Sequence, residues 1–209
     1  MLTIEKLQIW MIALQATYHE NKQYLTDLDA AIGDADHGIN MDRGYSAVKQ
    51  KIEGTAYKDI GSLLKTVAMT LISSVGGASG PLYGTFFLRA STACMGKTEL
   101  TDAEFVAMFK VGLHGIVQRG KANLADKTMV DALTPALDAM TQALENGATL
   151  TDILQAGTDA AEQGMQQTIP MLAKKGRASY LGERSIGHQD PGATSAYLML
   201  KTALDSWGE

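Results

Sequence analysis

The sequence predicts an all-α protein of about eight antiparallel helices in an up-and-down bundle or barrel. Apolar residues recur at steps of three and four along the 209-residue chain, and this is the period of one helix face. Strand-length runs of alternating polarity are hard to find. The connections are mostly short, which favours antiparallel neighbours. The length suits a single domain over residues 1–209, and no shift in composition marks a boundary.

Four sets of apolar residues mark the clearest helices, and each set draws one stripe along a helix. In chain order they are Ile4, Leu7, Met11, Leu14 and Tyr18; Ile60, Leu63, Val67 and Leu71; Phe105, Met108, Phe109 and Ile116; and Leu133, Leu137, Met140 and Leu144.

Capping residues and prolines predict where some helices begin and end. Thr101 and Glu104 form the pattern of a capping box. Pro81 suits the first turn of a helix, and Gly96 is placed where the C-terminal cap of that helix is expected. Pro170 should end or kink a later helix.

Composition excludes several functional classes. The formal net charge is −5, so there is no basic surface for nucleic acid. No apolar run approaches the ~20 residues that cross a bilayer, and the N-terminus lacks the pattern of a signal peptide. The single cysteine, Cys94, fits a reducing, cytoplasmic compartment, and its apolar surroundings favour a buried residue over a nucleophile.

Three segments rich in glycine and polar residues interrupt the helical pattern: residues 27–44, 73–84 and 174–192. In a bundle such segments lie at the ends of the helices. Loops on a rigid scaffold commonly carry binding residues, so these three are the candidates for a functional site.

The first segment places four aspartates within ten positions, between Asp27 and Asp36. Like charges held close together repel, and a hard divalent cation with oxygen ligands, such as Mg²⁺, would offset that repulsion. Bends at Gly33 and Gly38 could bring the carboxylates together. A solvated acidic turn or a set of helix N-caps explains the same spacing, and the spacing alone leaves these alternatives open.

The second segment contains Gly76, Gly77 and Gly80 ahead of a predicted helix. Backbone N–H groups at that helix start could meet an anion, although a tight turn between helices also needs glycine. The nearby sequence Gly96-Lys97-Thr98 does not complete a phosphate-binding P-loop, because Ser91 stands where that motif requires glycine.

The third segment is long for a connection in a compact domain, which itself suggests a function. Arg177 and Arg184 offer forked donors suited to phosphate oxygens. A solvated basic loop with surface ion pairs is the alternative.

Taken in order, residues 33–38 (GDADHG), 76–81 (GGASGP) and 176–184 (GRASYLGER) resemble the signature motifs of the dihydroxyacetone kinase L family. Residues 127–129 (KTM) and 188–192 (HQDPG) extend the resemblance over nearly the whole chain. It implies a barrel of eight antiparallel helices with ADP or ATP and two Mg²⁺ ions at one end. It also implies Asp29, Asp34 and Asp36 as the metal ligands.

The resemblance assigns further residues to the nucleotide. His37, Gly38, Ile39 and Asn40 are expected along its phosphates, Ala78 and Ser79 as donors from the glycine turn, Gly120 and Met129 at the adenine and ribose, and Arg177 with Asp190, Pro191 and Gly192 closing over it.

Partners follow from the same resemblance, and no catalytic residue is expected on this chain. In the family, a K subunit holds dihydroxyacetone and supplies the acid and base groups. A stand-alone chain resembles the type that is driven by phosphoenolpyruvate, in which a phosphohistidine relay (M) subunit recharges a tightly bound nucleotide and the product is dihydroxyacetone phosphate. Three alternatives stay open: exchange of ATP for ADP as in fused family members, a nucleotide sensor that docks on a transcriptional regulator, and a purely structural bundle.

Overall fold

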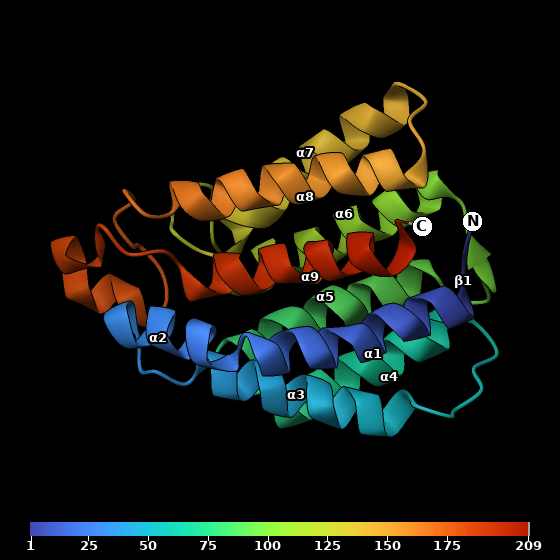
Figure 1. Cartoon of the computed structure of the whole chain (residues 1–209), viewed down its shortest axis with the longest axis horizontal. Coiled ribbons are helices and arrows are strands. Elements are labelled where there is room, and N and C mark those ends of the chain that lie inside the picture. Colours follow the sequence, from blue (N-terminus) through green and yellow to red (C-terminus); the bar gives the residue numbers. More distant parts are fainter. Residues whose placement is uncertain (209) are drawn as a thin grey trace.

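The computed structural model describes residues 1–208, and nearly all of their regular secondary structure is helical, as predicted (Figure 1). A two-stranded antiparallel ribbon joins the N-terminus to the middle of the chain, with Leu2 opposite Leu100. The elements are β1 (Leu2–Thr3), α1 (Ile4–Glu20), α2 (Lys22–Ile32), α3 (His37–Ile52), α4 (Ile60–Ser74), α5 (Ser79–Ala93), β2 (Glu99–Leu100), α6 (Asp102–Gly120), α7 (Met129–Glu145), α8 (Leu150–Gln167), the 3₁₀ segment η1 (Arg177–Ser185) and α9 (Pro191–Trp207).

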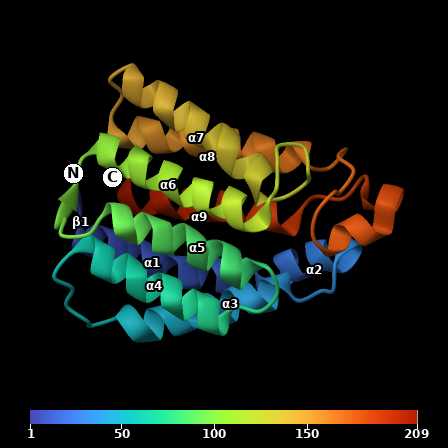
Figure 2. The same cartoon turned by 180° about the vertical axis from the view of Figure 1, so that it is seen from behind.

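Eight of the helices form a closed ring in which each helix runs antiparallel to its neighbours. The order around the ring is α1, α3, α4, α5, α6, α7, α8 and α9, and α9 packs against α1 to close it (Figures 1 and 2). The ninth helix, α2, continues α1 past the end of the ring and packs on α3 and α9. The predicted count of about eight antiparallel helices is therefore confirmed.

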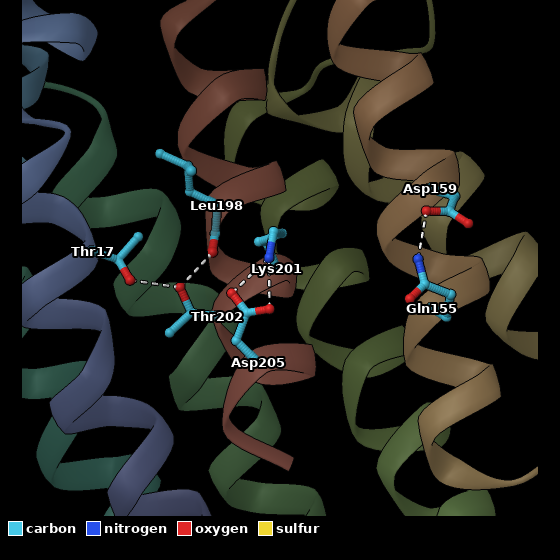
Figure 3. Close-up of polar contacts among 7 residues, drawn as sticks. All are labelled: Thr17, Gln155, Asp159, Leu198, Lys201, Thr202 and Asp205. Carbon is cyan, nitrogen blue, oxygen red and sulfur yellow. Dashed lines mark hydrogen bonds and ion pairs between the residues drawn. The ribbon is translucent and has the colours of Figure 1, made fainter. Parts of the chain in front are cut away.

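Helices α1 and α9 meet across the seam that closes the ring through several polar contacts. The Trp10 indole donates to the carbonyl of Met199 at 3.1 Å, and the Trp207 indole donates to that of Lys6 at 2.9 Å. The hydroxyls of Thr17 and Thr202 lie 2.8 Å apart across the same seam (Figure 3). Indole N–H groups and hydroxyls buried in this way need partners, so these contacts fix how α9 sits on α1.

One large hydrophobic cluster fills the ring and contains residues from every ring helix. The predicted stripes supply much of it: Leu7, Leu63, Phe105 and Leu133 are fully buried. Burying side chains of this size stabilises a fold by roughly 1.5–3 kcal/mol each. This rigid cylinder is the scaffold on which the end loops are mounted.

The local signals were right at three positions and wrong at one. Thr101 and Glu104 form the capping box of α6, Pro81 lies in the first turn of α5, and α8 ends at Gln167, before Pro170. Gly96 is not the cap of α5. That helix ends at Ala93, and Gly96 instead adopts a left-handed conformation (φ +76°) in the turn that follows.

Two of the three interrupting segments contain more helix than the sequence suggested. Only residues 33–36 of the first segment are non-helical, because α2 extends to Ile32 and α3 begins at His37. The third contains η1, which is interrupted at Gly182. All three lie at the same end of the ring, opposite the chain termini (Figures 1 and 2).

A shallow groove of about 510 Å³ runs between the outer faces of α8 and α9. Three of its four charged residues are paired within their own helices. Lys201 contacts Asp205 at 2.6 Å, and the Gln155 amide donates to Asp159 at 2.7 Å (Figure 3). Pairs at this spacing are typical of a solvated helix surface. Among the described residues, no helix is both long and apolar enough to cross a membrane.

Candidate functional site

A pocket of about 370 Å³ opens at the end of the ring that carries the three interrupting segments. The first residues of four helices line it: His37 of α3, Ser79 of α5, Met129 of α7 and Pro191 of α9. The last residues of α2 and α6 and part of η1 complete the wall. The predicted site residues on this wall are Asp29, Asp34, Asp36, His37, Asn40, Ala78, Ser79, Gly120, Met129, Arg177, Asp190, Pro191 and Gly192.

Gly38 and Ile39 are the two predicted residues that do not line the pocket. Gly38 faces α2, where a Cβ would lie 2.0 Å from the carbonyl oxygen of Lys22. Its position therefore requires glycine for close helix packing. Ile39 points outward and its side chain is 44% exposed. Both follow His37 in the first turn of α3, where the helix turns the Cβ position of Gly38 toward α2 and the side chain of Ile39 away from the pocket.

Three carboxylates meet at one side of the pocket. Asp29, Asp34 and Asp36 each offer an oxygen, and these oxygens lie within 4.8 Å of one another. Asp29 is buried on α2, Asp34 is exposed, and Asp36 is half-buried ahead of α3. Oxygen ligands clustered in this way suit a hard divalent cation. The donor set therefore fits Mg²⁺.

The helix-cap alternative is correct for part of this cluster. One oxygen of Asp29, Oδ2, accepts from the backbone N–H groups of Asp36 and His37 at 2.9 and 3.2 Å. Asp29 thus caps α3 from another helix and keeps its second oxygen free of those bonds. Asp36 stands at the N-cap position of α3, but its side chain makes no capping bond. Its carboxylate therefore stays available to a cation.

The backbone between the aspartates is held in an uncommon conformation. Ala35 has φ +59°, a left-handed conformation that costs a non-glycine residue about 1–2 kcal/mol. At Gly33 a Cβ would lie 2.0 Å from Oδ1 of Asp29, so no side chain fits there. Strained residues cluster at functional sites, and here the strain turns Asp34 and Asp36 toward Asp29.

The glycine turn leaves the start of α5 without a side-chain cap. Ala78 occupies the N-cap position and cannot cap, so the first N–H groups of α5 point out of the helix end beside the pocket. Gly77 has φ +63°, and at Gly76 a Cβ would lie 2.7 Å from Oδ1 of Asn40. An uncapped helix start beside a glycine turn is a suitable place for an anion.

Asn40 is oriented by a residue that the sequence did not single out. The Arg43 guanidinium donates to Oδ1 of Asn40 at 2.6 Å and to the carbonyl of Ser74 at 2.8 Å. Because Arg43 occupies the amide oxygen, the Asn40 NH₂ group is directed toward Gly77, with Nδ2 3.9 Å from the ideal Cβ position. Asn40 therefore presents a donor to the pocket.

His37 belongs to a buried polar chain beneath the pocket. Its Nδ1 lies 3.1 Å from the hydroxyl of Ser79, and its Nε2 lies 2.9 Å from that of Ser195. The Tyr83 hydroxyl is 2.8 Å from the same Ser195 oxygen. Burial lowers the pKa of His37, although Asp29 and Asp36 act in the opposite direction. The imidazole therefore stays neutral and orients Ser79 at the start of α5.

Residues 121–128 form the wall opposite the aspartates and contain three left-handed non-glycine residues: Lys121, Ala125 and Lys127. Asp131, in the first turn of α7, accepts from the N–H groups of Ala125 and Thr128 at 2.5 and 2.7 Å. Thr128 and Asp131 together form the capping box of α7. These bonds hold the strained loop and place Met129 on the pocket wall.

Asp190 and Arg177 approach the pocket from the C-terminal segment. Asp190 caps α9 by accepting from the N–H of Ala193 at 2.7 Å. The pKa of Asp190 is raised to about 7, mainly by burial and also by the charges of Asp131 and Asp29, while the bond from Ala193 and the charge of Lys127 act in the opposite direction. Nε of Arg177 lies 2.7 Å from Oδ2 of Asp34. The predicted anion-binding arginine therefore sits directly beside the carboxylate cluster.

Several pocket residues were not predicted from the sequence. They include Arg119, Lys127, Thr128 and Lys175. The pattern of threonine followed three residues later by aspartate at Thr128 is a readable helix-start signal. Lys127 belongs to the KTM motif and Lys175 to the third interrupting segment, but neither was assigned to the site, and the position of Arg119 leaves no local pattern.

Comparison with known proteins identifies the family. The model of the "DAK2 domain" matches residues 31–205. The chain is 49% identical over 202 residues to the PEP-dependent dihydroxyacetone kinase, ADP-binding subunit DhaL, of Escherichia coli, with 96% of each chain covered. It is 42% identical to the PTS-dependent dihydroxyacetone kinase, ADP-binding subunit DhaL, of Lactococcus lactis, with 98% of each covered.

A solved structure has the same fold. The dihydroxyacetone kinase of C. freundii in complex with AMP-PNP and Mg²⁺ superposes with a TM-score of 0.72 at 26% identity, over 96% of this chain and 34% of that one. The matches in sequence and fold together show that the chain belongs to the DAK2 domain family, that of the ADP-binding subunits of dihydroxyacetone kinases.

Proposed function

We propose that the protein is the nucleotide-binding subunit of a phosphoenolpyruvate-dependent dihydroxyacetone kinase, acting as one domain over residues 1–209. It holds ADP or ATP through two Mg²⁺ ions at the end pocket. A phosphohistidine relay (M) subunit phosphorylates the bound nucleotide. The phosphoryl group then passes to dihydroxyacetone on a K subunit, which gives dihydroxyacetone phosphate.

The convergence of Asp29, Asp34 and Asp36 carries this proposal. Three carboxylate oxygens within 4.8 Å of one another repel. The one cationic side chain of the described residues in contact with them, Arg177, pairs with Asp34 alone and leaves Asp29 and Asp36 without a counter-charge. The uncapped start of α5 faces the same pocket, and its N–H groups suit phosphate oxygens. Carboxylates cannot bind phosphates directly, so a cation between them accounts for both features.

The chain's own residues divide the work of binding. The three aspartates hold the metal, which when bound neutralises phosphate charge. Asn40 and Ser79, oriented by Arg43 and His37, donate hydrogen bonds at the phosphates. The remaining predicted residues have supporting roles: Gly38, Ile39 and Ala78 contribute backbone along the phosphates, Gly120 and Met129 border the base and ribose, and Arg177, Asp190, Pro191 and Gly192 close the open side.

Acceptor chemistry belongs to a partner in this proposal. Of the candidate bases on the pocket wall, His37 is buried between two hydroxyls and Asp190 caps α9. Neither is free to deprotonate a sugar hydroxyl at the pocket mouth. The names of the relatives, as PEP- and PTS-dependent kinase subunits, support separate K and M partners in the cytoplasm. The proposal also includes a transcriptional regulator as a partner, since a protein that docks at the pocket mouth would contact the bound nucleotide and could distinguish its phosphorylated state.

The test begins with the protein purified without added nucleotide. We expect denaturation to release ADP or ATP in a near one-to-one ratio, and metal analysis to give two magnesium ions per chain. Asp34→Asn should weaken ADP binding at millimolar Mg²⁺ by about two orders of magnitude, equivalent to about 3 kcal/mol. Asp27→Asn is the matched control, because Asp27 is exposed on α2 and bonds only Gln23.

Product formation separates a kinase subunit from a nucleotide sensor. With the K subunit, the phosphorylated relay protein and dihydroxyacetone, the wild type should form dihydroxyacetone phosphate and Asp34→Asn should not. Nucleotide binding without product would contradict the kinase proposal. Equal ADP affinity in the Asp34 and Asp27 variants would contradict the metal site itself.

A further inference from the structure

Lys127 is the only lysine or arginine among the largest fully buried side chains of the described residues, with 1% of its surface exposed. It also adopts a left-handed conformation, with φ +62°. A buried ammonium group is costly unless its hydrogen bonds are satisfied. Both features require a compensating interaction, and no acidic side chain lies within salt-bridge distance of it among the described residues.

The compensation comes from four backbone carbonyls of one segment, residues 169–188, which we call the closing segment. Nζ of Lys127 lies 3.4 and 3.1 Å from the carbonyl oxygens of Ile169 and Met171. It lies 2.7 and 2.5 Å from those of Ser185 and His188. One ammonium group therefore joins the two ends of the closing segment at its base.

Between these ends the closing segment has few other anchors, of which Lys174 provides two: its N–H donates to the carbonyl of Asp126 at 3.1 Å and its Nζ lies 3.9 Å from the Asp126 carboxylate. Gly176 and Gly182 adopt left-handed conformations, and nothing lies within 4 Å of the Cβ position of either. Tyr180 is 88% exposed. A small apolar cluster of Ile32, Ala173 and Ala178 holds its inner side. Segments with so few buried contacts open easily.

This outer part carries the residues that reach the pocket. Gly176, Arg177 and Ala178 line the pocket wall, and Arg177 contacts Asp34 at 2.7 Å. Lys127 itself lies two residues before Met129, in the strained loop on the opposite wall. The same short stretch of chain thus shapes one wall and ties down the other.

We propose that Lys127 is a positioning residue that holds the closing segment over the pocket and so presets Arg177 for the nucleotide. The role in nucleotide binding rests on the proposed function; the tethering does not. Lys127 has no free proton left for a phosphate, since its four carbonyl partners outnumber the three N–H donors of an ammonium group. Its effect on the ligand is exerted through the closing segment.

Trypsin tests the tether without any ligand, because the closing segment contains Lys174, Lys175, Arg177 and Arg184. Lys127→Met should speed native-state cleavage at these sites by about tenfold or more, with the sites identified by mass spectrometry. Lys127→Gln keeps one donor group and should lie between Met and wild type. Lys121→Met is the matched control, since Lys121 lies exposed in the same loop and also has a positive φ.

Tryptophan emission checks the fold independently of the closing segment. Trp10 and Trp207 are the two tryptophans of the chain, and they stack edge to face at 5.1 Å. Trp207 is the last residue of α9, at the end opposite Pro191 and the pocket. Both Lys127 variants should keep the wild-type emission. Loss of that emission in both would overturn the proposal, because Lys127 would then support the whole ring and not the closing segment.

A double-mutant cycle tests the link to the nucleotide. Lys127→Met should weaken binding of ADP with Mg²⁺ about tenfold in the wild type but much less in the Arg177→Ala background. Equal effects in both backgrounds, or unchanged cleavage with intact ADP binding, would refute the inference. If the wild type binds no ADP but Lys127→Met still accelerates cleavage, the proposed function fails and the tether stands.

Discussion

Replacing Asp190 by asparagine should make the protein more stable, and more so as the pH rises. Burial raises the pKa of Asp190 to about 7 in the folded protein, from an ordinary value of 3.8. Folding therefore favours the protonated form. Well below pH 4 the carboxyl group is neutral in both states and costs nothing. As the pH rises from 4 to 7 the unfolded state loses its proton first, so folding stability falls.

The shift of about three pKa units corresponds to about 4 kcal/mol at pH 7 and above, at 1.36 kcal/mol per unit. Asparagine removes this cost and is as good an N-cap as aspartate, so the bond from the N–H of Ala193 is kept. The stability gain of Asp190→Asn should therefore be near zero at pH 4, grow through pH 5 and 6, and level off above pH 7.

Urea unfolding followed by tryptophan emission, in EDTA and without nucleotide, measures this gain at each pH. Asp59→Asn is the control of opposite sign. Asp59 caps α4 at the other end of the ring, and the bond from the Ser62 N–H lowers its pKa. The aspartate form of Asp59 thus adds stability above pH 4, which the variant loses. If the gain in folding stability from Asp190→Asn does not change with pH, or falls as the pH rises, the raised pKa of Asp190 is refuted.

Three other predictions concern backbone strain, packing and thiol reactivity. Ala35→Val should lower the free energy of unfolding by about 1–3 kcal/mol and weaken Mg²⁺ binding measured by calorimetry, whereas Ala35→Gly should do neither, because φ at this position is +59°. Gly164→Ala should lower the free energy of unfolding in urea by about 1–3 kcal/mol, because the new Cβ would lie 2.2 Å from the backbone oxygen of Asp131. That oxygen lacks its usual partner within α7, since Pro135 has no N–H to bond it. An unchanged free energy of unfolding would contradict the close packing of α7 on α8. Burial raises the pKa of Cys94 to about 11, so alkylation by iodoacetamide at pH 8 should be about a hundredfold slower in the folded protein than in urea, and equal rates would contradict its burial.

The fold was readable from the sequence because most of its information is local. The apolar stripes, the capping box at Thr101 and the stops near Pro170 all act within a few residues. The two-residue strands β1 and β2 were not readable, since their pairing joins Leu2 to Leu100 across the chain. The boundaries of α2 and α3 were missed for a related reason: Asp29 and His37 are polar, and their helical positions depend on contacts with one another.

The site was readable in part. The density of aspartates pointed to a metal, but only the structure shows that Asp29 also caps α3 while Asp36 does not cap it. The roles of the site residues as metal and nucleotide ligands remain predictions. Arg43 and Lys127 act on Asn40 and on residues 169–188, and such long-range contacts leave no signature in spacing.

The geometry of the ring explains how an acidic chain can offer a site for a polyanion. In a closed ring of eight antiparallel helices, alternate helices must start at the same end. Helices α3, α5, α7 and α9 therefore bring four helix starts to one pocket, each carrying a partial positive charge.

The side chains on the pocket wall do not add to this field. Asp29, Asp34, Asp36 and Asp190 are matched in number by Arg119, Lys127, Lys175 and Arg177. Lys127 is bonded to carbonyls and Arg177 to Asp34. Few free cations remain for phosphates, so a bound divalent metal must supply most of the positive charge. Nucleotide affinity should accordingly depend far more steeply on Mg²⁺ than on ionic strength, because a cation in direct contact with three carboxylates, one of them buried, is screened little by salt.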